Sequence, residues 1–196
     1  MIFGKMKKRN NNKTKALMLL SLFFTTPVYA LELTELLQLF SQKKQSSADF
    51  NEKKQVSFLD EPIISSGFLK FTSPDKLEKH IVKPEKISQK ISANKLEVIN
   101  SDENHVISLD EYPEFTIILR ATRSVLAGDH TALRKDFKLN YKHTASNWTL
   151  HLTPHDSYIL GYVESIEMEG NNNTITKIII TEPNHDQSIT YLSNHH

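Results

Sequence analysis

The side chains that could carry catalysis or bind a metal are few and scattered in this sequence. His151, His155 and Asp156 come nearest to a metal-ligand cluster, but strand-to-turn geometry does not align the two histidines. Ser65 and Ser66 have no adjacent base, and we expect them in a turn. The chain contains no G-x-S-x-G, H-E-x-x-H, phosphate-loop or dinucleotide-binding motif. We therefore expect no catalytic residue, no bound metal and no cofactor.

The first 30 residues differ in composition from the rest of the chain. Six basic residues precede the short apolar run ALMLLSLFF, and Val28 and Ala30 are the small residues expected before a cleavage site. The alternative to a cleaved signal peptide is an uncleaved membrane anchor, but this apolar run is too short to span a bilayer permanently. We predict a cleaved signal peptide over residues 1–30 and a single exported domain, most simply periplasmic, over residues 31–196.

The net charge of the exported domain differs from that of the whole chain. The chain has a net charge of +1, but six of its 24 basic residues and none of its 23 acidic residues lie in the first 30. The remainder therefore carries 18 basic and 23 acidic residues, a net charge of −5. This acidic balance excludes nucleic acid as a partner. There is no cysteine, so the core must be stable without disulfides, and we expect a monomer.

Apolar residues recur mainly with the period of two that is typical of half-buried strands. A meander of strands is predicted from Ala48 to Leu109, and further strands follow Asp136, including the alternating runs DFKLNY and NWTLHLT. Turn residues such as SPD, SAN and SDEN separate the early strands. We predict ten or eleven strands in total.

Two or three helical pieces are predicted beside these strands. The segment LTELLQLFSQ has apolar residues at helical spacing, with Thr34 placed to cap it, and it either packs on the sheet or acts as a lid. A second helix begins at Pro113 and ends at Gly128, and Asp129 caps a further short turn.

The fold class predicted from these elements is mainly β (α+β). A long antiparallel sheet curls, and a few short helices cannot cover both of its faces. They are sized to plug the concave side and to leave apolar space between helix and sheet.

We place eleven apolar residues on the wall or lid of this space, with ordinary core packing as the alternative for each of them. They are Phe68, Phe71, Leu96 and Val98 on the early strands, Phe115, Ile118, Leu119 and Leu126 on the helix, and Trp148, Leu150 and Leu152 on a late strand.

Several stretches of the sequence, taken in order, resemble one known family. They are ADFNEKK, SSGFLKFTSPDKLEKHIVKP, KISANKLEVI, ATRSVLAGD, WTLHLTP and GNNNTITKIIITEPNHDQSITYL. With the signal peptide and the opening helix, they resemble the LolA family of periplasmic carriers, which move lipoproteins from the inner to the outer membrane of Gram-negative bacteria. The middle segment ISLDEYPEFTIILRATRSVLAGDHTAL is similar to a LolA-related branch often associated with polyene-pigment or lipid biosynthesis.

This resemblance implies an incomplete antiparallel β-barrel with a helical lid over an apolar cavity for acyl chains. It implies an acylated lipoprotein or lipid as cargo, a donor complex in the inner membrane and an acceptor at the outer membrane. The sequence departs from the family at one point. Classical carriers have an arginine just before the proline of the first hairpin turn, and this arginine holds the lid shut, whereas this chain has Ser73, Pro74 and Asp75 at the matching positions. A lipid-sensing or lipoprotein-sensing module that acts through a protein partner is the alternative function, since the same fold serves both.

Overall fold

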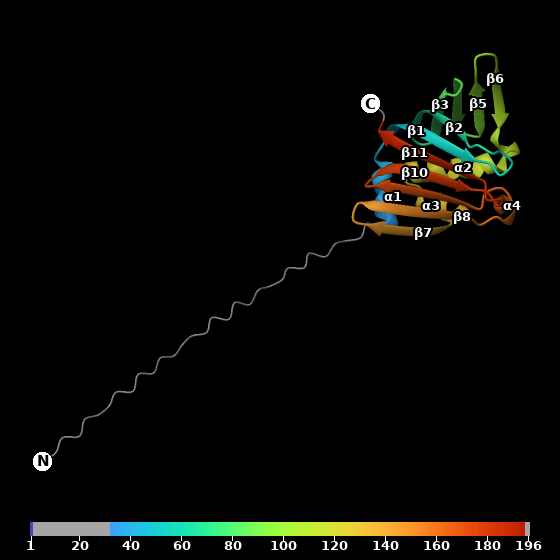
Figure 1. The fold of residues 1–196 in the computed structure, drawn as a ribbon. Coiled ribbons are helices and arrows are strands. Elements are labelled where there is room, and N and C mark those ends of the chain that lie inside the picture. Colours follow the sequence, from blue (N-terminus) through green and yellow to red (C-terminus); the bar gives the residue numbers. More distant parts are fainter. Residues whose placement is uncertain (2–31, 195–196) are drawn as a thin grey trace.

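The computed structural model describes Met1 and residues 32–194 of the chain. The predicted signal peptide, apart from Met1, lies outside the described residues and remains a prediction. The described part forms an incomplete antiparallel barrel, built from one eleven-stranded sheet whose strands run in the order β6-β5-β4-β3-β2-β1-β11-β10-β9-β8-β7 (Figure 1). The predicted fold class is confirmed, and so is the upper end of the predicted strand number.

The strands and helices follow one another along the chain as two meanders with a helical connection between them. The first meander comprises α1 (Leu33–Ser41), β1 (Gln45–Gln55), β2 (Ile63–Thr72), β3 (Lys76–Lys83), β4 (Ile87–Ser92), β5 (Lys95–Ile99) and β6 (Asn104–Ser108). The connection comprises the short 3-10 turn η1 (Leu109–Glu111), α2 (Pro113–Ala127) and α3 (His130–Asp136). The second meander comprises β7 (Phe137–Thr144), β8 (Asn147–Pro154), α4 (Ser157–Leu160), β9 (Ser165–Asn171), β10 (Thr174–Thr181) and β11 (Gln187–Asn194).

The strand order explains why a helix crosses the sheet. β1 and β11 pair along eight residue positions in the middle of the sheet, so the two meanders extend away from each other on either side. The last strand of the first meander, β6, and the first strand of the second, β7, therefore become opposite edges. The chain between them has to return across one face, and α2 and α3 make this return behind the strands in Figure 1.

The bounds of α2 and α3 follow from local chemistry. Pro113 is the first residue of α2, where its missing N–H costs nothing. Gly128 ends α2 in the left-handed conformation with φ of 73°, which a glycine adopts without strain. The Asp129 side chain accepts a hydrogen bond from the Ala132 N–H at 2.9 Å and so caps α3. All three positions agree with the sequence-based expectations.

Two local expectations are wrong. Thr34 does not cap the first helix, because Glu32 occupies the capping position and its N–H donates to the Glu35 carboxylate at 3.2 Å. Ser65 and Ser66 lie within β2, not in a turn, and pair with Glu52 and Asn51 of β1. The β1–β2 loop ends earlier than the polar residues suggested.

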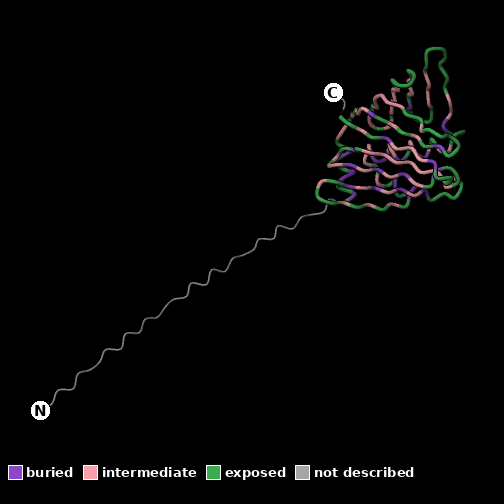
Figure 2. The backbone as a smooth tube through the Cα atoms, in the orientation of Figure 1, coloured by how far each residue is buried: buried purple, intermediate pink, exposed green. Residues whose placement is uncertain are grey.

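The solid core occupies only one part of the sheet. Buried side chains from α1, α2 and α3 pack there against strands β7 to β10, and buried segments are sparse around β3 to β6 (Figure 2). The members of this core are Leu33, Leu36, Leu37, Phe40, Ile117, Ala121, Val125, Leu133, Phe137, Trp148, Leu150, Leu152, Val163, Ile166, Met168 and Ile175. The helices therefore fill one half of the concave face and leave the other half without a packed layer.

Within the described residues, none of the helices combines the length and the apolar character that a membrane span requires.

A truncation in the packed half tests this division. Leu150 is fully buried in the core, so Leu150→Ala leaves a cavity and should lower the free energy of unfolding by about 2–5 kcal/mol. Val106 on the edge strand β6 is 64% exposed, so Val106→Ala should change it by less than about 0.5 kcal/mol. Urea denaturation of both variants measures the difference, and equal effects would contradict the location of the core.

Candidate functional site

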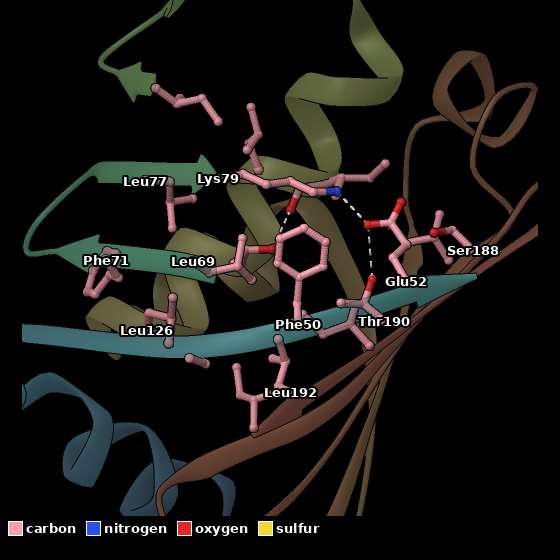
Figure 3. A pocket seen from close by; sticks show the side chains of 18 of the residues that line it. Phe50, Glu52, Leu69, Phe71, Leu77, Lys79, Leu126, Ser188, Thr190 and Leu192 are labelled. Carbon is pink, nitrogen blue, oxygen red and sulfur yellow. Dashed lines mark hydrogen bonds and ion pairs between the residues drawn. The ribbon is translucent and has the colours of Figure 1, made fainter. Parts of the chain in front are cut away.

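A cavity of about 900 Å³ lies in the half of the sheet that the core does not fill. Its floor is formed by β1 to β5, β10 and β11, and its roof is formed by α2 (Figure 3). This volume is in the upper part of the range of small-molecule sites in proteins.

The apolar floor results from the alternation of side chains along the strands. Phe50 of β1 and Leu192 of β11 are paired residues, and their side chains point into the same space in Figure 3. Leu69 and Phe71 of β2, two residues apart, face the same side. Leu77 of β3 pairs with Phe71 and extends the surface. Five apolar side chains from four strands thus make one continuous wall.

The roof consists of one stripe of α2. Phe115, Ile118, Leu119, Thr122 and Leu126 recur at spacings of three and four residues, and all of them line the cavity. The spacing therefore brings one whole face of the helix over the floor.

A second stripe of α2 lies beside the first. Ile117, Ala121 and Val125 are buried against α1 and the core. Because this second stripe fixes α2 on the packed half, the first stripe extends over the hollow half, although Ile118 and Leu126 also pack in part against the core.

Six of the eleven sequence-predicted site residues come together at this cavity. They are Phe71 and Leu96 on the sheet, and Phe115, Ile118, Leu119 and Leu126 on α2. Phe115 is half exposed at one end of the roof, whereas Phe71 is almost fully buried in the floor.

The other five predicted residues do not line the cavity. Trp148, Leu150 and Leu152 of β8 belong to the solid core, because β8 lies in the half of the sheet that α1 to α3 cover. Phe68 points to the opposite face of β2 and stacks on His80, with ring centroids 4.5 Å apart. Leu96 of β5 lines the cavity, but Val98, two residues further along the same strand, does not.

Several residues of the cavity wall were not predicted from the sequence. Phe50 lies in the polar stretch ADFNEKKQ, so its apolar character is isolated in the sequence. Leu192, Ile178 and Ile180 lie on the closing strands and line the cavity from the other meander. The signal that could have identified Phe50 is its alternation with Ala48, which places both on one face of the strand.

One end of the cavity is polar. Glu52 Oε2 lies 2.5 Å from the Lys79 Nζ, and the Thr190 hydroxyl contacts the same carboxylate oxygen at 3.4 Å (Figure 3). Lys79 Nζ also lies 4.9 Å from the centre of the Phe50 ring. A second ion pair joins Lys54 Nζ to Glu182 Oε1 at 3.4 Å. The charged side chains of this end are thus paired with one another and meet the apolar floor at Phe50.

A single arginine links the roof helix to a turn of the sheet. Arg123 of α2 donates from Nη1 to the Ala93 carbonyl in the β4–β5 turn at 2.8 Å. The Ala93 N–H in turn donates to the Asp75 carboxylate of the β2–β3 turn at 3.0 Å. Burial lowers the pKa of Arg123, whereas the nearby Asp75 opposes this shift. The turn formed by Ser73, Pro74 and Asp75, which lacks an arginine, is thereby connected to α2 through Ala93.

This contact predicts that Arg123 steadies the roof helix. Its Nε and Nη2 atoms are buried without a hydrogen-bond partner among the described residues, so Arg123→Met removes both one favourable bond and two uncompensated donors. We expect a small change in the free energy of global unfolding, but an increase of about tenfold in amide hydrogen exchange of α2.

Arg134→Met is the matched control for this experiment, because Arg134 of α3 contacts His130 of its own helix and not the sheet. Exchange in α2 that is equal in the two variants would show that Arg123 does not hold the roof.

The family described as "Outer membrane lipoprotein carrier protein LolA-like" matches residues 25–194 of the chain. None of the curated proteins compared with the chain matches it.

Three similar solved structures share little sequence with the chain. A LolA superfamily protein from Nitrosomonas europaea is 11% identical, with a TM-score of 0.45 over 85% of this chain and 92% of its own. A putative outer membrane lipoprotein-sorting protein domain from Vibrio parahaemolyticus is 10% identical, with a TM-score of 0.43 over 84% of this chain and 90% of its own. The MucA/MucB complex of Pseudomonas aeruginosa contains a chain that is 9% identical, with a TM-score of 0.37 over 83% of this chain and 56% of its own.

The family match extends across nearly all of the described sheet and helices. It includes the roof helix, the cavity floor and both meanders. The chain belongs to the LolA-like family of outer membrane lipoprotein carrier proteins.

Proposed function

We propose that this protein is a periplasmic carrier, which binds the acyl chains of lipoproteins or other lipids in the cavity beneath α2 and carries them towards the outer membrane. The observation that supports this function most directly is the apolar cavity of about 900 Å³ between α2 and the sheet. Membership of the LolA-like family supports the same function. The predicted signal peptide supports export.

The energetics of an acyl chain favour such a cavity. Burial contributes about 0.8 kcal/mol for each CH₂ group, so a chain of about sixteen carbons represents on the order of 12 kcal/mol of transfer free energy. Without a carrier, the acyl chain would stay in its membrane, or would aggregate if it entered water. The wall formed by Phe50, Leu69, Phe71, Leu77 and Leu192 offers matching apolar surface in a water-soluble particle.

Release requires that the empty protein recover part of this burial. The stripe of α2 from Phe115 to Leu126 already faces the floor, so a small movement of α2 towards the sheet would cover the apolar wall in the absence of cargo. Binding and closure then compete for the same surface, and an acceptor with a modest advantage removes the cargo. This cycle uses no catalytic residue.

By resemblance to the family, a complex in the inner membrane would load the carrier and a receptor at the outer membrane would unload it. In this scheme, the cavity beneath α2 is the place where the carrier would hold the cargo between the two partners.

A charge placed on the roof should abolish binding. Leu119→Glu puts a carboxylate over the apolar floor, where burial disfavours the ionised form and any acyl chain must lie beside it. We expect the affinity for a fluorescent acyl probe to fall about tenfold or more, which corresponds to about 1.4 kcal/mol for each factor of ten. Probe titration of the folded variant measures this loss.

Two controls accompany this titration. Leu119→Met keeps the apolar volume and should bind the probe normally. Val106→Glu adds the same charge on an exposed edge strand and should also bind normally. Normal binding by Leu119→Glu would remove α2 from the proposed site.

Transfer between membranes separates a carrier from a lipid sensor. The purified protein should accelerate the movement of a fluorescent acylated lipid from donor vesicles to acceptor vesicles, in proportion to its concentration, and Leu119→Glu should not. Tight binding without any acceleration of transfer would contradict the carrier function and favour a sensing module. Mass spectrometry of lipid retained by natively purified protein would identify the cargo.

A further inference from the structure

The cavity has two chemically different ends, and the difference runs along the strands. On β1, Phe50 is followed on the same face by Glu52 and Lys54. On the paired strand β11, Leu192 opposite Phe50 gives way to Thr190 opposite Glu52. The register therefore sets an apolar row beside polar rows, and Figure 3 shows Glu52, Thr190 and Ser188 on one side and Phe71 on the other.

The ion pair at the polar end retains hydrogen-bonding capacity. Lys79 and Glu52 are partly accessible, with 26% and 19% of their side chains exposed. An ammonium group has three N–H donors, and one of the donors on Lys79 is directed at Glu52. Both Lys79 and Thr190 approach Oε2 of Glu52, and no described residue donates to Oε1. A ligand can therefore accept a hydrogen bond from Lys79 and donate one to Glu52.

The charges at this end are already compensated. Lys79 faces Glu52, and Lys54 faces Glu182. An anionic head group entering here would find no free cation and would lie beside two carboxylates, whose repulsion it would have to overcome. A neutral head with hydroxyl or amide groups meets no such penalty, because it can use the remaining donor and acceptor positions of the pair.

We propose that the polar end formed by Glu52, Lys79 and Thr190 is a head-group site, selective for acyl compounds with an uncharged hydroxyl or amide head over free fatty-acid anions. The proposal rests on the function proposed above and specifies its ligand class. The acyl chain lies along Phe50, Leu69 and Phe71, and the head remains at the paired charges.

Two lysines of the cavity lining, Lys43 and Lys70, face no carboxylate among the described residues. Lys70 Nζ lies 5.4 Å from the centre of the Phe68 ring, on the opposite face of β2, so Lys43 is the one that offers its ammonium group to the cavity, at the end opposite Glu52. Lys43, before the start of β1, donates to the Asn173 carbonyl at 2.7 Å, and burial lowers its pKa. Lys54 and Lys79 already face carboxylates, so a fatty-acid anion could form an ion pair only with Lys43. The position of the head group is therefore testable by comparing Lys43 with Lys79.

The test is competition against a bound fluorescent acyl probe at about pH 8, where a fatty acid in water is ionised. Monopalmitoylglycerol and the amide of N-palmitoylglycine serve as uncharged competitors with a hydroxyl and an amide head, and palmitate serves as the anion. In the unmodified protein, at least one uncharged competitor should bind about tenfold more tightly than palmitate. The two uncharged competitors then show whether the site prefers a glyceryl or an amide head.

Charge-changing variants locate the selectivity. Glu52→Gln frees the charge of Lys79, so palmitate should bind about tenfold more tightly while the uncharged competitors change by less than about threefold. Lys79→Gln leaves Glu52 unpaired and should weaken palmitate further. Lys53→Gln, on the neighbouring exposed position of β1 outside the cavity lining, is the matched control and should change none of these affinities.

Three results would overturn the proposal. Equal affinity for all competitors, unchanged in Glu52→Gln, would show that the ion pair is structural only, while the binding itself would leave the carrier function intact. Preference for palmitate that disappears in Lys43→Gln would place the head at the opposite end. Failure of the probe and of every competitor to bind the folded, unmodified protein would instead refute the proposed function, and the head-group site with it.

Discussion

The structure depends on a mismatch between the area of its sheet and the area of its helices. Eleven strands form one concave face, and the helices α1 to α3 bury their apolar sides against only the part formed by β7 to β10. Over the other strands, α2 alone provides a roof, and a single helix covers too little width to fill the space beneath it. The cavity left beneath α2 is therefore lined by apolar side chains of that half, of which Leu69 and Leu77 remain only half-buried. Such a hollow is costly for folding stability, since its walls lose the contacts that a filled core provides.

The division between the two halves limits how much of the site the sequence could predict. Periodicity identified the strands, and Pro113 and Gly128 bounded α2 correctly, because helix ends depend on local chemistry. Periodicity also placed Leu150 on an inward face. It could not tell whether a helix would cover that face, because this depends on the path of the connection between β6 and β7, which is a property of the whole sheet. Phe50 escaped notice for the opposite reason, since the charged residues around it concealed one of the most buried side chains of the wall.

The same charged residues are difficult to explain by stability alone. A partly buried ion pair such as Glu52 with Lys79 loses hydration on both partners, and apolar residues of similar size often stabilise a protein as well or better. Two residues earlier on the same strands, Phe50 of β1 and Leu77 of β3 line the wall with apolar side chains. A function in binding offers a reason for polar groups at one end of an otherwise apolar wall, because an amphiphile has a head that must keep its hydrogen bonds while its chain is buried.

An amphipathic cavity also eases the conflict between holding a lipid and releasing it. If the whole amphiphile were enclosed, the head would lose its hydration, and the roof would have to open completely before an acceptor could reach any part of the ligand. With the head at the paired charges, only the chain needs the cover of α2. The stripe from Phe115 to Leu126 can then move towards Phe50 and Leu69 as the chain withdraws, so that apolar contacts within the protein replace contacts with the ligand one after another. The barrier to release is then set by the short length of chain exposed at any moment and not by the full transfer free energy of the hydrocarbon. On this reasoning, the roof has to stay only loosely attached to the hollow half, which agrees with its attachment to the β4–β5 turn through the single bond from Arg123 to Ala93.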